Sequence, residues 1–450
     1  MANFHKIKKG LDIRLKGRAV KELVETEKPE KIAVKPTDFH GVTPKLTVKQ
    51  GDQVKAGTPL FFNKYRPEVL FTAPVSGVVS DIHRGERRKI LEVIIDPDNQ
   101  GIKEKFDTYE QTGDDNEKIK NNILKSGLWP FIIQRPYNVI ANPNDIPQHI
   151  YISGFDSAPL APDYDFLYSE DNECFNLGVD VLSKLTPGKV HLSINMDKET
   201  PAVFKNINNV EVHMFSGPHP AGNVGIQIHK INPLNKGDLV WTISPLGVIM
   251  IGRLFKYGYI DSEIVVALTG SEVINPKYYK TVMGAQICSI TKDNIKNENV
   301  RIISGNVLTG NKVTESGFLS FYHQQLTVIP EGNYYRFLGW AMPGFKRYST
   351  SRTFPSWLSQ KKERVIDTNL NGGKRAFIMT GEYERVLPMD IYPQQLLKAI
   401  LVEDIDKMEN LGIYEIAEED LALCEFVCTS KIDVQEIVRQ GLDLMIKELT

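Results

Sequence analysis

Apolar and polar positions alternate in short runs over residues 1–100, where Gly, Pro and Asp separate one run from the next. This punctuation predicts β-strands that are joined by tight turns. Within the region, residues 48–60 and 71–82 each combine a glycine turn with an apolar flanking run. We therefore expect an all-β domain over residues 1–100 that contains two interleaved hairpins.

Residues 110–257 have a different pattern, in which strand-like apolar runs alternate with helical spacing. One helix is expected over residues 116–126, and another around Val179, Leu182 and Leu185. Strands are expected at 149–153, 189–194 and 210–215. Because strands that alternate with helices favour parallel pairing through crossover connections, this region is predicted to be a Rossmann-like α/β domain.

Three further regions are expected in the rest of the chain. Residues 260–330 return to β character around a helix, which suits a small β-grasp (SLBB-like) domain. Residues 331–389 are rich in Gly, Pro, Ser and aromatic residues and are expected to be an irregular β and loop region. Residues 390–450 are predicted to form a helical domain. Its first apolar face comprises Leu396, Leu397, Ile400, Leu401, Ile405 and Met408, and its last helix begins at Asp433.

Composition narrows the class of protein. The chain has 54 Lys plus Arg against 56 Asp plus Glu, and this balance argues against a nucleic-acid-binding protein, which usually has a basic surplus. No run of 18 apolar residues is present, so we expect no transmembrane helix. With 4 cysteines and no apolar leader, a soluble protein of a reducing compartment is expected.

The glycine-rich segment Gly217–Gly225 directly follows the strand expected at 210–215. Glycines at a strand-to-helix junction allow backbone N–H groups to approach a phosphate. The spacing departs from GxGxxG, however, so a tight turn or an interface loop is the favoured interpretation. His219 lies between two prolines, which would display its ring for a partner or a polar ligand.

Metal and cluster sites are not expected. The 9 histidines show no helical ligand spacing. Cys424 and Cys428 fit the last two positions of the iron–sulfur pattern C-x₂-C-x₂-C-x₃-C-P, but Glu418 and Leu421 occupy its first two. Since leucine cannot ligate iron, the motif is degenerate and we expect no cluster.

Two resemblances to known families are carried by particular words of the sequence. The halves VKQGDQVKAGTPL and FTAPVSGVVSDI resemble the lipoyl/biotinyl-type barrel-sandwich fold. Nearly the whole chain is similar to the A subunits of the bacterial Na⁺-translocating NADH:quinone reductases. The words that carry this similarity are IKKGLD at 7–12, SGLW at 126–129, GPHPAG at 217–222, TVMGA at 281–285, VRIISG at 300–305, FLGWAMPG at 337–344 and EDLALCEFVC at 419–428.

The second resemblance implies a peripheral subunit on the cytoplasmic face of the bacterial inner membrane. It would belong to a six-subunit complex that couples electron transfer from NADH to ubiquinone to Na⁺ export. No redox cofactor is implied for this subunit, whereas FAD, FMN, riboflavin and iron–sulfur centres are implied for its partners. The family is also similar in architecture to the NADH- and flavin-binding subunits of respiratory complex I and the Rnf complex.

The resemblance suggests no catalytic residue here and a position close to the quinone site, next to the quinone-side membrane subunit. Gly217, His219, Gly222, Tyr335 and Trp340 are candidates to line a quinone site or to contact a partner, although core packing would also explain the aromatic residues. An independent flavin- or NADH-binding oxidoreductase, a lipoyl-type carrier modified at Lys64, and a purely structural subunit remain open alternatives.

Overall fold

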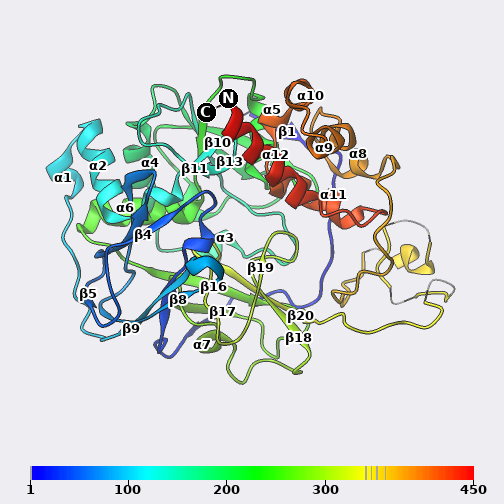
Figure 1. The fold of residues 1–450 in the computed structure, drawn as a ribbon, viewed down its shortest axis with the longest axis horizontal. Coiled ribbons are helices and arrows are strands. Elements are labelled where there is room, and N and C mark those ends of the chain that lie inside the picture. Colours follow the sequence, from blue (N-terminus) through cyan, green and yellow to red (C-terminus); the bar gives the residue numbers. More distant parts are fainter. Residues whose placement is uncertain (1–2, 340–341, 346, 351–352, 360, 450) are drawn as a thin grey trace.

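The computed structural model describes residues 3–339, 342–345, 347–350, 353–359 and 361–449. Four β-sheets and their connecting helices make up the molecule (Figure 1). In the view of Figure 1, two small sheets lie at the left, a six-stranded sheet at the bottom and the C-terminal helices at the upper right.

The two small sheets contain the N-terminal barrel strands, in the orders β3-β9-β8-β5 and β4-β6-β7. These strands are β3 Ile32–Val34, β4 Pro44–Leu46, β5 Gln53–Val54, β6 Pro59–Asn63, β7 Arg66–Thr72, β8 Gly77–Arg84 and β9 Ile90–Pro97. The stacked rings of Phe61 and Phe71, 4.6 Å apart, fill the core. A Cβ at Gly77 would lie 2.2 Å from the carbonyl oxygen of Asp96, so only glycine allows β8 and β9 to approach as they do.

The first two strands of the chain lie outside these sheets, which differs from an all-β domain that starts at residue 1. Strand β1, Asn3–Lys6, pairs in parallel with β14, and β2, Leu23–Glu25, pairs in parallel with β17. Each strand covers an edge of another sheet. The N-terminal segment therefore joins three parts of the fold.

The seven-stranded sheet has the order β1-β14-β13-β12-β15-β10-β11. Strands β1, β14, β13, β12 and β15 are parallel, as predicted for this region, whereas β10 and β11 run antiparallel at one edge. Their bounds are β10 Ile133–Arg135, β11 Val139–Ile140, β12 Ile150–Ser153, β13 Val190–Asn195, β14 Val210–Ser216 and β15 Val240–Thr242.

Helices cover both faces of this sheet. Helices α4 and α6 pack with the apolar side chains of one face, and α5 packs against Tyr151 on the other. The first pair approaches closely because Gly178 and Gly252 lie against the backbone of the opposite helix. The helices of this region are α1 Tyr109–Thr112, α2 Asn116–Ser126, α3 Tyr164–Leu167, α4 Asn172–Ser183, α5 Val224–Ile231 and α6 Pro245–Tyr257.

The six-stranded sheet has the order β19-β18-β20-β16-β17-β2. Its other elements are β16 Glu263–Thr269, β17 Tyr278–Val282, α7 Cys288–Thr291, β18 Val300–Ser304, β19 Asn311–Val313 and β20 Gln325–Pro330. Short 3₁₀ helices link elements elsewhere: η1 Pro36–Asp38, η2 Glu86–Arg88, η3 Trp129–Phe131, η4 Ala202–Phe204, η5 Pro355–Ser359, η6 Ile413–Glu415 and η7 Glu418–Leu421.

The C-terminal region is helical, as predicted, but its first apolar face is interrupted. Helix α9 ends at Leu401, which is 53% exposed, so the prediction that Leu401 belongs to the apolar face is wrong. Glu403 has φ of +56°, and Asp404 caps the next helix by accepting from the backbone N–H of Lys407. The helices are α8 Glu382–Val386, α9 Pro393–Leu401, α10 Ile405–Asn410, α11 Ala422–Val427 and α12 Val434–Leu449. Within the described residues, no helix combines the length and the apolarity that crossing a bilayer would need.

Candidate functional site

A cavity of about 240 Å³ lies at the carboxyl ends of β12 and β15. These two strands are neighbours in the sheet, and the chain continues from β12 to β13 on one side and places β15 on the other. The strand order therefore reverses at this point. In open α/β sheets, ligands bind in the crevice that such a reversal opens.

The cavity wall combines apolar, aromatic and acidic side chains from four regions of the chain. Its apolar and aromatic residues are Phe131, Ile133, Phe155, Ala158, Tyr164, Val224, Ile243, Pro245, Leu308 and Tyr322. Its acidic residues are Asp156 and Glu419, and no Lys or Arg is among the described lining residues. Burial raises the pKa of Asp156 above its usual value. A neutral ligand suits this wall better than an anionic one.

His219 and Gly222 line the cavity from the loop between β14 and α5. His219 is only 4% exposed, so the prolines beside it hold the ring inside the protein rather than displaying it on the surface. Its backbone N–H donates to Asp12 Oδ1 at 3.0 Å, and its carbonyl accepts from the N–H of Leu11 at 2.8 Å. The N-terminal segment thus fixes the loop. Gly217, with φ of +125°, begins the loop but is not among the lining residues.

The protonation state of His219 follows from its neighbours. Burial lowers its pKa to about 4, so the ring is neutral at pH 7. Its Nδ1 lies 3.0 Å from Ser157 Oγ, which also accepts the backbone N–H of Gly222 at 2.8 Å. Ser157 can therefore donate its hydroxyl proton to Nδ1, and this assignment leaves the ring proton on Nε2.

Two tyrosines contribute hydroxyl groups to the wall. Burial raises the pKa of Tyr164 well above its usual value, so the phenol stays protonated. The Tyr322 hydroxyl donates to the carbonyl of Pro130 at 2.7 Å. In contrast, the Tyr164 hydroxyl has no hydrogen-bond partner among the described residues, which leaves it able to donate to a ligand.

Glu419 belongs to an ionic cluster that ties the sheet to the C-terminal helices. Arg135, at the end of β10, donates to Glu419 Oε1 at 2.8 Å and to Asp420 Oδ2 at 3.3 Å. Burial raises the pKa of Glu419, the Arg135 charge opposes this shift, and Asp420 and Glu418 add to it. Glu418 in turn accepts from Arg439 at 3.0 Å.

The remaining candidates from the sequence lie elsewhere. Tyr335 is fully exposed in the 331–389 region and lines a different hollow, and Trp340 lies outside the described residues. Cys424 and Cys428 are buried, and the Cys428 sulfur accepts from the Tyr383 hydroxyl at 3.0 Å. Leu421 packs in the core, so residues 418 and 421 serve ion pairing and packing. Lys64 lies at the turn between β6 and β7, with its ammonium group 5.7 Å from the Tyr65 ring.

Four lining residues, Tyr164, Tyr322, Asp156 and Glu419, were not predicted from the sequence. Asp156 carried a usable signal, because it closely follows the strand predicted at 149–153 and so lies at the carboxyl end of a parallel strand. The other three come from separate regions of the chain, and only the packing of those regions brings them together.

Comparisons with known proteins agree along the chain. Residues 5–98 match the family model described as "NqrA N-terminal barrel-sandwich hybrid domain", 114–260 match "NqrA second alpha/beta domain", and 265–315 match "NQRA C-terminal domain". These matches confirm the predicted barrel-sandwich and α/β regions.

Three relatives share similar identity over nearly their whole length, and each is named as the A subunit of a Na(+)-translocating NADH-quinone reductase. The protein of Yersinia pestis bv. Antiqua is 39% identical over 97% of this chain and 98% of its own. That of Neisseria meningitidis serogroup B is 39% identical over 98% and 99%. That of Pasteurella multocida is 38% identical over 98% and 99%.

Proposed function

Because the chain belongs to the NqrA family, the A subunits of Na⁺-translocating NADH-quinone reductases, we propose that it serves as the A subunit of such a complex. In this proposal the complex has six subunits, and this one is peripheral on the cytoplasmic face of the bacterial inner membrane. The flavins and iron–sulfur centres belong to its partners. Its own task is structural, with a surface that contacts ubiquinone beside the quinone-side membrane subunit.

The observation that carries the quinone contact is the cavity at the ends of β12 and β15. A quinone head group is neutral, flat and mostly apolar, with two carbonyl oxygens that accept hydrogen bonds. Aromatic and aliphatic walls with a few convergent donors are typical of sites for such ligands. The phenol of Tyr164 and the Nε2–H of His219 are the two donors that this wall would offer.

The same wall counts against a nucleotide or flavin phosphate. A pyrophosphate at this place would face the carboxyl groups of Asp156 and Glu419, with no lining Lys or Arg among the described residues to balance its charge. An independent flavin- or NADH-binding oxidoreductase is therefore the second choice. The α/β region would then act as a scaffold that shapes the cavity.

The domain organisation is part of the proposal. We assign the barrel-sandwich domain to residues 1–100, the Rossmann-like domain to 110–257, the β-grasp domain to 260–330, the irregular region to 331–389 and the helical domain to 390–450. The limits of the three family matches, near residues 98, 114, 260 and 265, support the first boundaries.

The test uses the purified full chain. An absorption spectrum comes first, because a flavin or iron–sulfur spectrum would favour the independent oxidoreductase. Tryptophan fluorescence is then followed during titration with a short-chain ubiquinone. Trp241 is a suitable reporter because it precedes Thr242, which lines the cavity.

The decisive comparison is between Tyr164→Phe and Tyr168→Phe. Losing one neutral hydrogen bond of about 0.5–1.5 kcal/mol should weaken quinone binding roughly three- to tenfold in Tyr164→Phe. Tyr168 lies one turn away but does not line the cavity, so its variant should bind as the wild type does. Equal affinities in both variants, or quenching that does not saturate, would contradict the proposed contact.

A further inference from the structure

Four of the 9 histidines meet on one face of the seven-stranded sheet, remote from each other in sequence. The register of the parallel strands explains why. His191 on β13 lies opposite Glu211 on β14, and His213 is two residues further along β14. Since alternate residues of a strand point to the same face, the three side chains project together. His149 and His5 flank them, with ring centroids 4.9 Å from His191 and 5.6 Å from His213.

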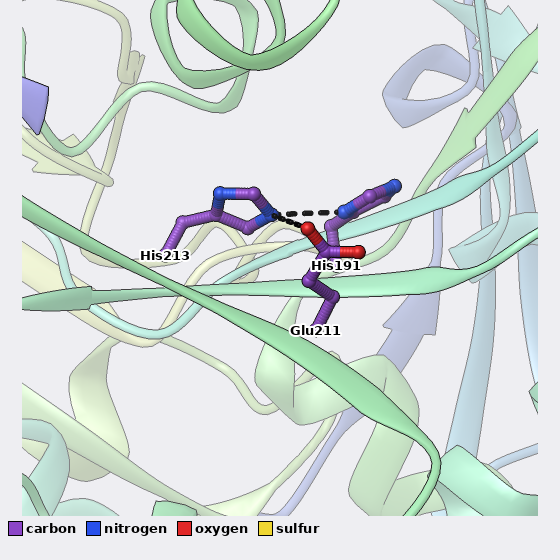
Figure 2. Close-up of side chains that lie close together, drawn as sticks. All are labelled: His191, Glu211 and His213. Atoms are coloured by element: carbon purple, nitrogen blue, oxygen red, sulfur yellow. Dashed lines mark hydrogen bonds and ion pairs between the residues drawn. The ribbon is translucent and has the colours of Figure 1, made fainter. Parts of the chain in front are cut away.

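The polar atoms of His191, Glu211 and His213 converge, as Figure 2 shows. His191 Nδ1 lies 3.0 Å from His213 Nε2, and His213 Nε2 lies 3.8 Å from Glu211 Oε1. One ligand atom from each residue falls within 4.8 Å of the other two. Two imidazoles and one carboxylate are a donor set that zinc proteins use.

We propose that His191, Glu211 and His213 bind a single transition-metal dication of the Zn²⁺ class. With metal–ligand bonds of about 2.1 Å, tetrahedral geometry separates ligand atoms by roughly 3.4 Å, and the observed 3.0 and 3.8 Å bracket that value. Three protein ligands leave a fourth position, which a water molecule would fill. This inference is independent of the proposed quinone contact.

The state of the ligands suits metal binding. Burial lowers the pKa of both rings, that of His191 to about 4, so the rings are neutral at pH 7 and need not be discharged before they bind a cation. Without a metal, one ring donates a hydrogen bond to the other, and the ion would take the place of that shared proton. The outer ring nitrogens, His191 Nε2 and His213 Nδ1, have no partner among the described residues.

Glu211 gives access and orientation. Its side chain is 31% exposed, whereas that of His213 is 2% exposed, so an ion would enter from the Glu211 side. Lys189 holds Oε2 at 2.7 Å and Asn3 donates to Oε1 at 3.1 Å. Such outer contacts orient a ligating carboxylate. Nitrogen donors favour Zn²⁺, Co²⁺ or Ni²⁺ over Mg²⁺, which prefers oxygen.

The test titrates metal-stripped full chain, purified without a histidine tag, with Zn²⁺ by calorimetry and with Co²⁺ by absorption. We expect one equivalent of either metal to bind, and Mg²⁺ to fail to compete. The double variant His191→Gln/His213→Gln should bind on the order of a hundredfold more weakly. The matched control His149→Gln, which removes a neighbouring ring outside the ligand set, should bind as the wild type does.

Any of three results would overturn the proposal: no saturable Zn²⁺ binding by the wild type, equal binding by the double variant, or loss of binding in His149→Gln alone. If the double variant does not fold, Glu211→Gln replaces it, since this partly exposed residue keeps its shape. That variant should weaken Zn²⁺ binding at least tenfold, and unchanged binding would refute the ligand assignment.

Discussion

Replacing Arg135 with Met should destabilise the protein strongly, because the change strands a buried carboxylate. The Arg135 side chain is 2% exposed and that of Asp420 is fully buried, whereas the Glu419 side chain keeps 40% exposure. Water can therefore reach Glu419 but not Asp420. Asp420 would retain only its hydrogen bond from the N–H of Ala417 at 2.9 Å.

The magnitude follows from this burial. Removing one partner of a buried ion pair costs about 3–5 kcal/mol, whereas an exposed pair is worth about 0–1 kcal/mol. Arg385→Met is the matched control, since Arg385 pairs with Glu382 at 2.7 Å and its side chain is 60% exposed. Urea unfolding, followed by circular dichroism, should show a large loss of unfolding free energy for the first variant and less than about 1 kcal/mol for the second.

The pH dependence adds a sign to the prediction. Burial already raises the pKa of Asp420, and losing Arg135 would raise it further. The folded variant then holds a proton that the unfolded chain releases, so its stability falls as pH rises. The deficit of Arg135→Met should thus be larger at pH 8 than at pH 5. Adding Asp420→Asn should recover about 2 kcal/mol or more.

A loss of less than about 1 kcal/mol in Arg135→Met would refute this reasoning. The same holds if Asp420→Asn does not restore stability to the folded double variant. Either result would mean that Asp420 is neutral or hydrated in the wild type, and that the ion pair does not join the sheet to the C-terminal helices.

Two further predictions concern single sites. Cys288 is exposed and the other three cysteines are buried, so a thiol reagent should modify one equivalent in the native chain and four after unfolding; Cys288→Ser should abolish the native reaction, and its persistence would contradict the burial pattern. Hydrogen bonding from Arg301 lowers the pKa of Glu331 to about 2, which stabilises the fold above the ordinary pKa of 4.5 and is lost as pH falls towards 2. Glu331→Gln should therefore cost about 1–2 kcal/mol at pH 7, after solvent screening, and progressively less in acid, as unfolding curves at several pH values would show. A pH-independent difference would refute that assignment.

Local patterns predicted individual elements well. The helix expected at 116–126 is α2 with the same bounds, and the strand expected at 263–269 is β16. In both cases apolar spacing, capping residues and glycine punctuation act within a few residues, so the sequence carries the signal directly. The break after Leu401 was missed because apolar spacing continues to Met408, and the cap at Asp404 is a weaker signal.

Long-range arrangement was not predictable in the same way. Strand β1 lies beside β14, more than 200 positions later, and nothing in Asn3–Lys6 specifies that edge. The metal cluster depends on the register of β13 and β14, which no ligand spacing encodes. Tyr164, Tyr322 and Glu419 line one cavity only because three regions pack together. The quinone candidates chosen from sequence were therefore only partly those that the fold assembles.

Photoaffinity labelling of the assembled complex tests the quinone contact most directly. A ubiquinone with a photoreactive group on its ring would be cross-linked, and the labelled peptides of the NqrA-family chain would be identified by mass spectrometry. We expect label within residues 153–164, 219–224 or 242–245, competed by unmodified ubiquinone. Label confined to the exposed region around Tyr335, or label that excess ubiquinone does not reduce, would contradict the contact.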